Sequence, residues 1–178
     1  DLWAVERRRA LAALLRLHPS AAASHETGRI LQRLPDPRPG APAPSVVVVT
    51  AARSGGLKPG LRIVSHDLDP RDVDVVGGVR CTAVPRTALD VAVGRPLREG
   101  LVVLDAAVAR TGPAELLEAY ERLPRLRGLR GLREAVTYAD GRAESPLESA
   151  SRGVMIEARL PQPELQQWVA DLKGRRWR

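Results

Sequence analysis

The sequence predicts an α+β fold in which a small antiparallel sheet flanked by helices is followed by a helical segment. A continuous β-branched run at 46–50 indicates a buried strand. A Gly-Gly pair at 77–78 separates two strand-like segments, 73–76 and 79–83, which is typical of a β-hairpin with a primed turn. Beyond these strands the apolar residues recur at helical spacing, so sheet and helices are segregated along the chain.

The amino-terminal third is expected to contribute two helices and most of the sheet. Apolar spacing predicts a helix over 3–17, which His18-Pro19 ends, and a short helix through Leu34 with Ser24 as its N-cap. The five prolines between Pro35 and Pro44 indicate a loop. We expect about four antiparallel strands, including an alternating one over 61–65 that places Leu61, Ile63 and Ser65 on one face.

The rest of the chain is predicted to be helical until its last segment. Pro85 can occupy the first position of a helix to Val93, in which Arg86 and Asp90 are spaced to pair. Further helices are expected over 97–108, 113–120, 126–136 and 146–158. The last of them combines an N-cap serine, a proline at the first position and an acid at the third, and its buried face is expected to be Leu147, Ala150, Ser151, Val154, Met155 and Ala158. A strand over 165–170, a turn over 171–174 and a second strand cut short at Arg178 lead us to interpret the chain as a fragment.

Composition narrows the class of protein. The net charge of +7 favours an anionic partner such as nucleic acid. Only Lys58 and Lys173 are lysines, however, and an excess of Arg, Ala, Gly and Pro is typical of GC-rich genes, so part of this charge is compositional. Cys81 is the only cysteine, which excludes a disulfide or a cysteine zinc site within this chain. No apolar run approaches the ~18 residues of a membrane helix, and we expect a soluble cytoplasmic protein without membrane partners.

Arginines form the best candidate for a nucleic-acid surface. Arg127, Arg130 and Arg133 recur every three residues, so they share one side of a helix and can follow a phosphate backbone. The alternative is an ordinary solvated face opposite Leu126, Leu129, Leu132 and Val136. No aromatic residue lies between the arginines, so base stacking is not expected there.

Glu148 is the candidate metal ligand and catalytic acid. With Glu144 it could contribute to a metal site at the start of a helix. The alternative is a capping box with Ser145, and an ion pair with Arg152 one turn later. The histidines His18, His25 and His66 are scattered, and His25 would need partners that the sequence does not identify.

Several motifs together resemble a family of high-GC Gram-positive bacteria. They are Ser24-His25-Glu26-Thr27 after a leucine-rich helix, 84–90 (Val-Pro-Arg-Thr-Ala-Leu-Asp) after a hairpin, 104–107 (Leu-Asp-Ala-Ala), and 144–149 (Glu-Ser-Pro-Leu-Glu-Ser) followed by Leu160-Pro161. In the first part the chain resembles antitoxins of the type IV abortive-infection (AbiEi) kind. From about residue 140 it resembles the start of a very-short-patch-repair endonuclease-like domain of the PD-(D/E)XK superfamily.

This resemblance implies domains and a site. It implies an antitoxin-like α+β domain over 1–94, a helical connector over 95–139, and over 140–178 the first helix and strands of a restriction-endonuclease-like domain. Glu148 matches the acid on the first helix of such nucleases, whereas their strand Asp and acid-x-Lys have no counterpart here. Hydrolysis of DNA with Mg²⁺ would then need the longer protein, and we expect neither activity nor a bound cofactor in these residues. If the match holds, Glu148 should face the open end of the last hairpin.

Three functions remain open from the sequence. The first is a defence or regulatory protein associated with nucleic acid, with an endonuclease-like domain that is incomplete here. The second is a non-enzymatic transcriptional regulator or antitoxin that binds DNA or a cognate toxin. The third is an α+β domain whose charge reflects only genome composition.

Overall fold

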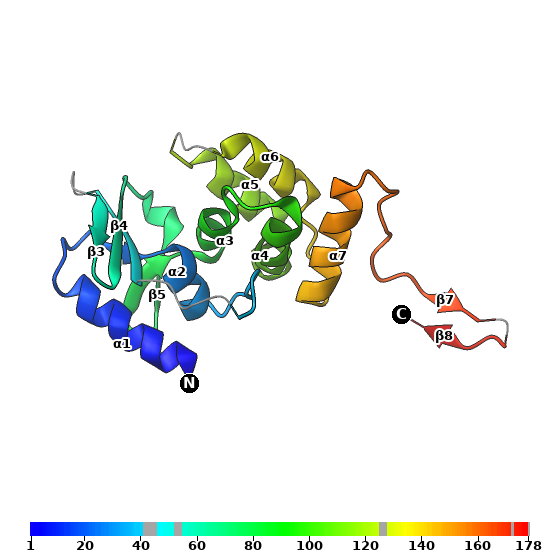
Figure 1. Ribbon diagram of the computed structural model, residues 1–178, viewed down its shortest axis with the longest axis horizontal. Helices are drawn as coiled ribbons and strands as arrows, with labels where there is room; N and C mark the ends of the chain where they lie inside the picture. The colour runs from blue at the N-terminus through cyan, green and yellow to red at the C-terminus, as the bar shows by residue number, and fades with distance from the viewer. Residues whose placement is uncertain (41–45, 52–54, 125–127, 172, 178) are drawn as a thin grey trace.

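We describe the protein from a computed structural model that covers residues 1–40, 46–51, 55–124, 128–171 and 173–177. Figure 1 shows a sheet with α1 beneath it, a central group of helices, and a hairpin that projects from the far end. The helices are α1 (Leu2–Leu14), α2 (His25–Leu31), α3 (Val84–Ala92), α4 (Leu97–Thr111), α5 (Pro113–Glu121), α6 (Leu129–Tyr138) and α7 (Pro146–Glu157). The strands are β1 (Ala22–Ala23), β2 (Val46–Thr50), β3 (Gly56–Lys58), β4 (Leu61–Ser65), β5 (Val73–Val76), β6 (Val79–Thr82), β7 (Val169–Ala170) and β8 (Arg176–Trp177).

The α+β class predicted from the sequence is confirmed, but the sheet is larger and of a different kind than expected. Its six strands have the order β3-β4-β2-β1-β6-β5. The β5–β6 and β3–β4 pairs are antiparallel, whereas β2–β4 and β1–β6 are parallel, so a purely antiparallel sheet of four strands was wrong. The predicted hairpin at Gly77-Gly78 is confirmed, and both glycines have the positive φ that its turn requires.

One face of the sheet is covered by α1. Val46, Val48 and Ile63 point to this helix, together with Ala23 and Cys81 nearer the other edge. Because strand side chains alternate, Val47, Val49 and Arg62 belong to the opposite face, and Val47 lies opposite Arg62 in the β2–β4 pair. That second face lies toward α2 and α3, and it carries the site described below.

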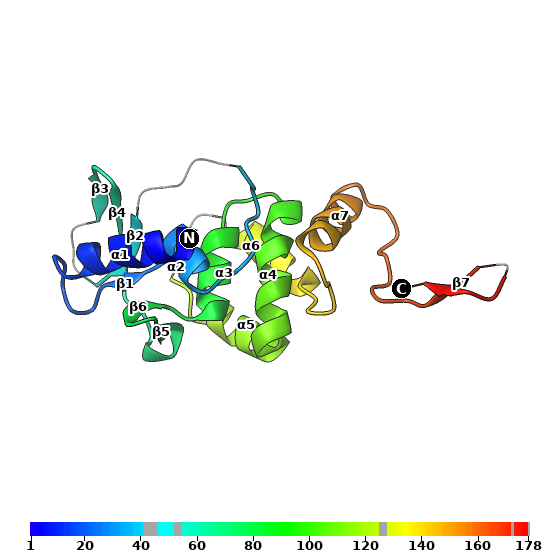
Figure 2. The same ribbon diagram turned by 90° about the horizontal axis from the view of Figure 1, so that it is seen from below.

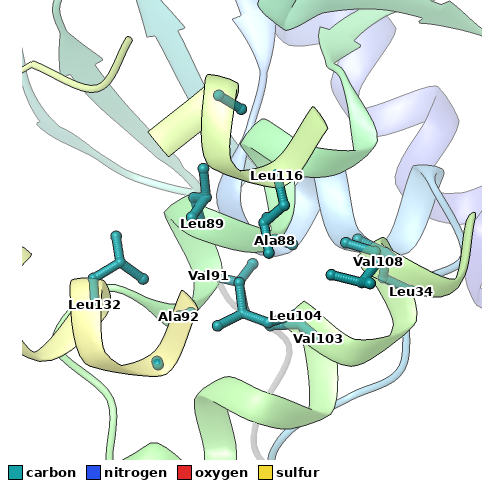
Figure 3. Close-up of a cluster of buried hydrophobic side chains, with 13 residues drawn as sticks. Leu34, Ala88, Leu89, Val91, Ala92, Val103, Leu104, Val108, Leu116 and Leu132 are labelled. Atoms are coloured by element: carbon teal, nitrogen blue, oxygen red, sulfur yellow. The ribbon is translucent and has the colours of Figure 1, made fainter. Parts of the chain in front are cut away.

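A second core holds the helices together. Leu89, Leu104, Leu116 and Leu132 come from α3, α4, α5 and α6 and are all at most 2% exposed. Figure 3 shows these side chains converging between the helices. The helix starts were predictable because Pro85, Pro113 and Pro146 each occupy the first turn of a helix.

The buried face predicted for the helix after Ser145 was wrong. Leu147 is 75% exposed and Val154 49% exposed, while Ser149, Arg152 and Gly153 are the buried residues of α7. The reason is that α7 packs against α4 through small and charged groups instead of an apolar stripe. A Cβ on Gly153 would lie 2.3 Å from the Cα of Arg98, so the two helices approach at backbone distance.

The last strands are shorter than predicted. β7 covers only Val169–Ala170, and Gly174 N–H donates to Asp171 O at the expected turn. Both views show this hairpin extending away from the helices, joined to α7 by a long connection (Figures 1 and 2). None of the described helices combines the length and apolar character needed to cross a bilayer.

Candidate functional site

The structure gives Glu148 a capping geometry at the start of α7. Its Oε2 accepts the backbone N–H of Glu144 at 2.8 Å, and Ser145 Oγ accepts the N–H of Glu148 at 3.1 Å. Gln166, which precedes β7, donates to Glu148 Oε1 at 3.3 Å, so the carboxylate faces the segment before the hairpin. This is the geometry of a helix cap with one further side-chain bond. A metal role for Glu148 stays a prediction.

The ion pair predicted between Glu148 and Arg152 was wrong. Arg152 turns to α4, where its Nη2 lies 2.7 Å from both carboxylate oxygens of Asp105, and its Nη1 donates to Tyr138 O. The side chains of Arg152 and Asp105 are 5% and 1% exposed, so this is a buried ion pair between α7 and α4. The described residues contain no group of three His, Cys, Asp or Glu side chains that could hold a metal ion. The donors among the described residues therefore do not fit a Mg²⁺ centre.

Two of the three predicted nucleic-acid-binding arginines lie on the solvent side of α6. Arg130 and Arg133 are exposed, while Leu132 and Ala135 between and beside them are buried. No acidic partner for either arginine occurs in the described part of the chain. Arg127 lies outside the described residues. Arg122, earlier in the same basic run, is instead held inward by Asp72.

The most highly organised polar cluster is one that the sequence did not identify, and it is built around Arg86. This residue stands in the first turn of α3, directly after β6, and its side chain is only 1% exposed. Its Nε donates to Asp90 Oδ1 at 2.9 Å, one helical turn later, as their spacing predicted. Its Nη1 lies 3.5 Å from Asp72 Oδ2, and its Nη2 donates to His66 Nε2.

Asp72 links this cluster to the helical core. Arg122 follows α5, and its Nε and Nη2 donate to Asp72 Oδ1 at 2.9 and 2.7 Å. Asp72 is 1% exposed and lies in the short 3-10 turn η1 (Pro70–Asp72) just before β5. One buried carboxylate therefore receives two guanidinium groups, from α3 and from the end of α5, which stabilises an otherwise costly buried charge.

Both histidines of the cluster are held neutral near pH 7. Burial, with the positive charges of Arg62 and Arg86, lowers the pKa of His25 to about 4. Burial and the adjacent Arg86 also lower the pKa of His66, consistent with its Nε2 accepting a hydrogen bond. His25 opens α2 with a φ of +49°, which a non-glycine residue rarely adopts.

Ser24 is the N-cap residue of α2, but its hydroxyl does not cap the helix. Its Oγ lies 3.0 Å from Nδ1 of His25, and no helix N–H donates to it. Ser24 is 0% exposed, so it cannot reach a substrate as a nucleophile. The Ser-His pair of the first motif therefore orients the imidazole.

Asp90 carries the one unusual atom of the cluster. Its Oδ1 is bonded to Arg86, but its Oδ2 is buried and has no hydrogen-bond partner among the described residues. Burial raises the pKa of Asp90, against the opposing effect of Arg86. An unsatisfied buried oxygen is costly and is rare in native proteins, so this atom needs a physical explanation.

Apart from the resemblance of the 84–90 motif, the sequence signal for this cluster was the four-residue spacing of Arg86 and Asp90. The other three residues come from distant parts of the chain and meet Arg86 and Asp90 only in the folded protein. His66 follows β4, Asp72 lies in η1, and Arg122 follows α5. The sequence identified no partner for His25. In the structure its ring contacts the hydroxyl of Ser24, and the charges of Arg62 and Arg86 act on it.

Comparison with known proteins gives relatives without an assigned function. Uncharacterized protein Rv2248 and Uncharacterized protein MT2308, from two strains of Mycobacterium tuberculosis, are each 37% identical to the chain over 126 residues. The aligned part is 68% of this chain and 46% of each relative, so the chain spans about half the length of the curated relatives it matches. No family model matches the sequence, and no solved structure matches it significantly.

Proposed function

We propose that this chain is part of a bacterial defence or regulatory protein that binds nucleic acid, of the antitoxin-like kind. In this proposal residues 1–139 bind DNA or a cognate toxin and do not carry out catalysis. The protein acts in the cytoplasm, where nucleic acid is available to it. The resemblance in the motifs around His25, Arg86 and Asp105 supports this class of protein.

The observation that carries the nucleic-acid part is the exposed arginine face of α6. Arg130 and Arg133 lie three positions apart on one helix and are exposed. Most other described arginines are committed to acids or carbonyl groups, as Arg71 is to Asp69 and Arg142 to Asp140. A cation without an acidic partner can approach a phosphate without first losing an ion pair, so these two side chains are the better phosphate ligands.

The carboxy-terminal part, from about residue 140, is proposed to begin an endonuclease-like domain. The motif around Glu148 supports this, and Glu148 would be its helix acid. Cleavage of DNA with Mg²⁺ would require further ligands beyond these residues. The 178-residue chain should therefore not nick a plasmid in Mg²⁺ or Mn²⁺. Metal-dependent nicking that Glu148→Ala abolishes would contradict this.

The test of nucleic-acid binding compares two double variants with the same loss of charge. Arg130→Gln with Arg133→Gln removes the α6 face, whereas Arg71→Gln with Arg142→Gln removes exposed arginines that already have acidic partners. Binding to duplex DNA is measured by fluorescence anisotropy as a function of salt.

The α6 variant should lower the slope of log K against log salt by roughly 2, at about 0.9 for each lost phosphate contact. The control variant should leave the slope close to that of the parent protein. An unchanged slope in the α6 variant, or an equal fall in both variants, would show that α6 is an ordinary solvated face.

A further inference from the structure

A cavity of about 500 Å³ opens on the sheet face opposite α1. It is bounded by the start of α2 with His25, by β4 with Arg62, and by the end of α3 with Asp90. Its volume falls within the range of small-molecule sites, which is roughly 300–1,000 Å³. The cavity is separate from α6, none of whose residues line it.

Asp90 borders the cavity and carries a buried acceptor without a partner among the described residues. The residue is 4% exposed, and its Oδ2 has no partner in the described part of the chain. The other oxygen is fixed by Arg86 at 2.9 Å, so the carboxylate cannot rotate away without losing that bond. A ligand N–H or O–H that reaches this oxygen, by displacing the groups that cover it, would satisfy it and remove the cost of leaving it unpaired.

Arg62 supplies the cavity with an uncommitted cation. It is exposed on β4, in register with Val47 of β2, and no acidic partner for it occurs among the described residues. The two other lining arginines are committed: Arg38 donates to Glu99 at 2.7 Å, and Arg95 donates to Glu26 at 2.6 Å. The cavity can therefore bind an anionic group at Arg62 without breaking an existing ion pair.

The rest of the lining is mostly apolar, with one further acid, Glu26, whose carboxylate pairs with Arg95 and Arg29. Val47, Leu57, Val91 and Val93 present apolar surface, and His25 adds an imidazole that is neutral near pH 7. A ligand that matches these walls has a flat or apolar body, one hydrogen-bond donor and one anionic group. Simple anions such as phosphate match only Arg62 and would be repelled by Asp90.

A free amino acid and a nucleotide each have a hydrogen-bond donor and an anionic group. The positive charge of Arg86 beside Asp90 distinguishes between them. A free amino acid would place its ammonium group next to Arg86, which already neutralises Asp90 through the Nε–Oδ1 bond. A neutral amino group on a nucleobase donates a hydrogen bond without adding a second cation at this point. The cavity volume also exceeds what a small amino acid would fill.

We propose that the cavity between His25, Arg62 and Asp90 is a binding site for a single nucleotide. The amino group of the base donates to Asp90 Oδ2, the base packs against the valine side chains, and the phosphate pairs with Arg62. The same chemistry is offered by a free nucleoside monophosphate and by the phosphorylated end of a single strand. No bond is made or broken at this site.

The test uses isothermal titration calorimetry on the whole chain with adenosine monophosphate, adenosine and a short single strand with a terminal phosphate. Arg62→Gln is chosen because the residue is exposed, so the fold should survive the change. Arg80→Gln is the matched control, since Arg80 is an exposed arginine of β6 in the same sheet and does not line the cavity. Asp90→Asn is a second variant, because its amide N–H₂ would face the donating amino group of the base. Its folding is checked by circular dichroism.

We expect Arg62→Gln to weaken binding of the monophosphate about tenfold or more, as for the loss of a charged hydrogen bond, and Arg80→Gln to leave it unchanged. Adenosine should bind Arg62→Gln and the parent chain equally. Binding of the monophosphate but not the strand identifies a free nucleotide as the ligand, and the reverse identifies a strand end.

The proposal is overturned if no nucleotide binds at millimolar concentration, if Arg62→Gln binds like the parent chain, or if amino acids bind in place of nucleotides. The duplex salt slope of Arg62→Gln and the nucleotide affinity of the Arg130→Gln, Arg133→Gln variant are measured as well. These two readouts separate failure of this site from failure of the α6 surface.

Discussion

Replacing Gly153 by alanine should reveal how closely α7 is docked on α4. The added Cβ would lie 2.3 Å from Cα, 2.9 Å from N and 3.0 Å from Cβ of Arg98. Two of these atoms belong to the backbone, so no rotation of a side chain can relieve the contact. Optimal separation of carbon atoms is about 3.5–4.0 Å, and α7 would therefore have to move by roughly 1 Å or more.

Two effects of opposite sign determine how Gly153→Ala changes the free energy of unfolding. Alanine is favoured over glycine inside a helix by about 1 kcal/mol. Overpacking a well-packed contact costs about 1–3 kcal/mol, and here the movement also pulls Arg152 from Asp105, a pair 2.7 Å apart in a buried position. We expect the cost of overpacking to exceed the gain in helix propensity, so that the free energy of unfolding falls by about 1–2 kcal/mol.

Gly131→Ala is the matched control, because Gly131 lies in α6 and a Cβ there would meet nothing within 4 Å. This variant should gain up to about 1 kcal/mol from helix propensity alone. Both variants are compared by urea denaturation followed by circular dichroism. Trypsin provides a local readout, since cleavage after the buried Arg152 requires α7 to detach. If Gly153→Ala is stabilised as much as Gly131→Ala and resists trypsin, the close approach of the two helices is refuted.

Substitutions at three further places test the buried histidine, the buried ion pair and the helix cap. The pKa of His25 is about 4 in the folded chain and 6.5 ordinarily, so stability present above pH 6.5 should be lost as the pH falls toward 4. His25→Asn, which suits the positive φ, should reduce this fall by up to about 3 kcal/mol in urea unfolding across that range; an identical pH profile would contradict it. Arg152→Met leaves Asp105 buried and should cost about 3–5 kcal/mol, whereas adding Asp105→Leu should recover part of the loss; a double variant no more stable than the single one opposes this. Glu148→Ala removes the bond to the Glu144 N–H and should cost about 0.5–2 kcal/mol, so an unchanged melting temperature would exclude a capping role.

Helices could be predicted well because their signals are local. Pro85, Pro113 and Pro146 mark first turns, and Ser145 caps α7 as its sequence indicates. The face of α7 was mispredicted because Arg152 was expected to pair with Glu148 on the same helix, whereas its ion pair with Asp105 of α4 allows it to be buried. Burial of a charged residue depends on a partner far along the chain, which periodicity cannot show.

The sheet and the cluster were harder to predict for the same reason. β1 has only two residues, Ala22–Ala23, too few to show an alternating pattern, and its partners β2 and β6 come much later in the chain. Neither His66 nor Asp72 belongs to a sequence motif. Their contacts with Arg86 can be recognised only in the folded structure. The family resemblance drew attention to 84–90, but not to the cavity on which Asp90 borders.

The short strand β1 has a consequence for the order in which the protein folds. It joins β3-β4-β2 to β6-β5, with one parallel bridge between Ala23 and Cys81. The β5–β6 hairpin and the β3–β4 pair close small loops and can form early, but β1 must wait for residues far along the chain. During synthesis on the ribosome, the two halves of the sheet therefore cannot be joined until β6 has emerged. Until then α1 lacks its contacts with Val79 and Cys81 and can cover only the half of the face that β2 and β4 form.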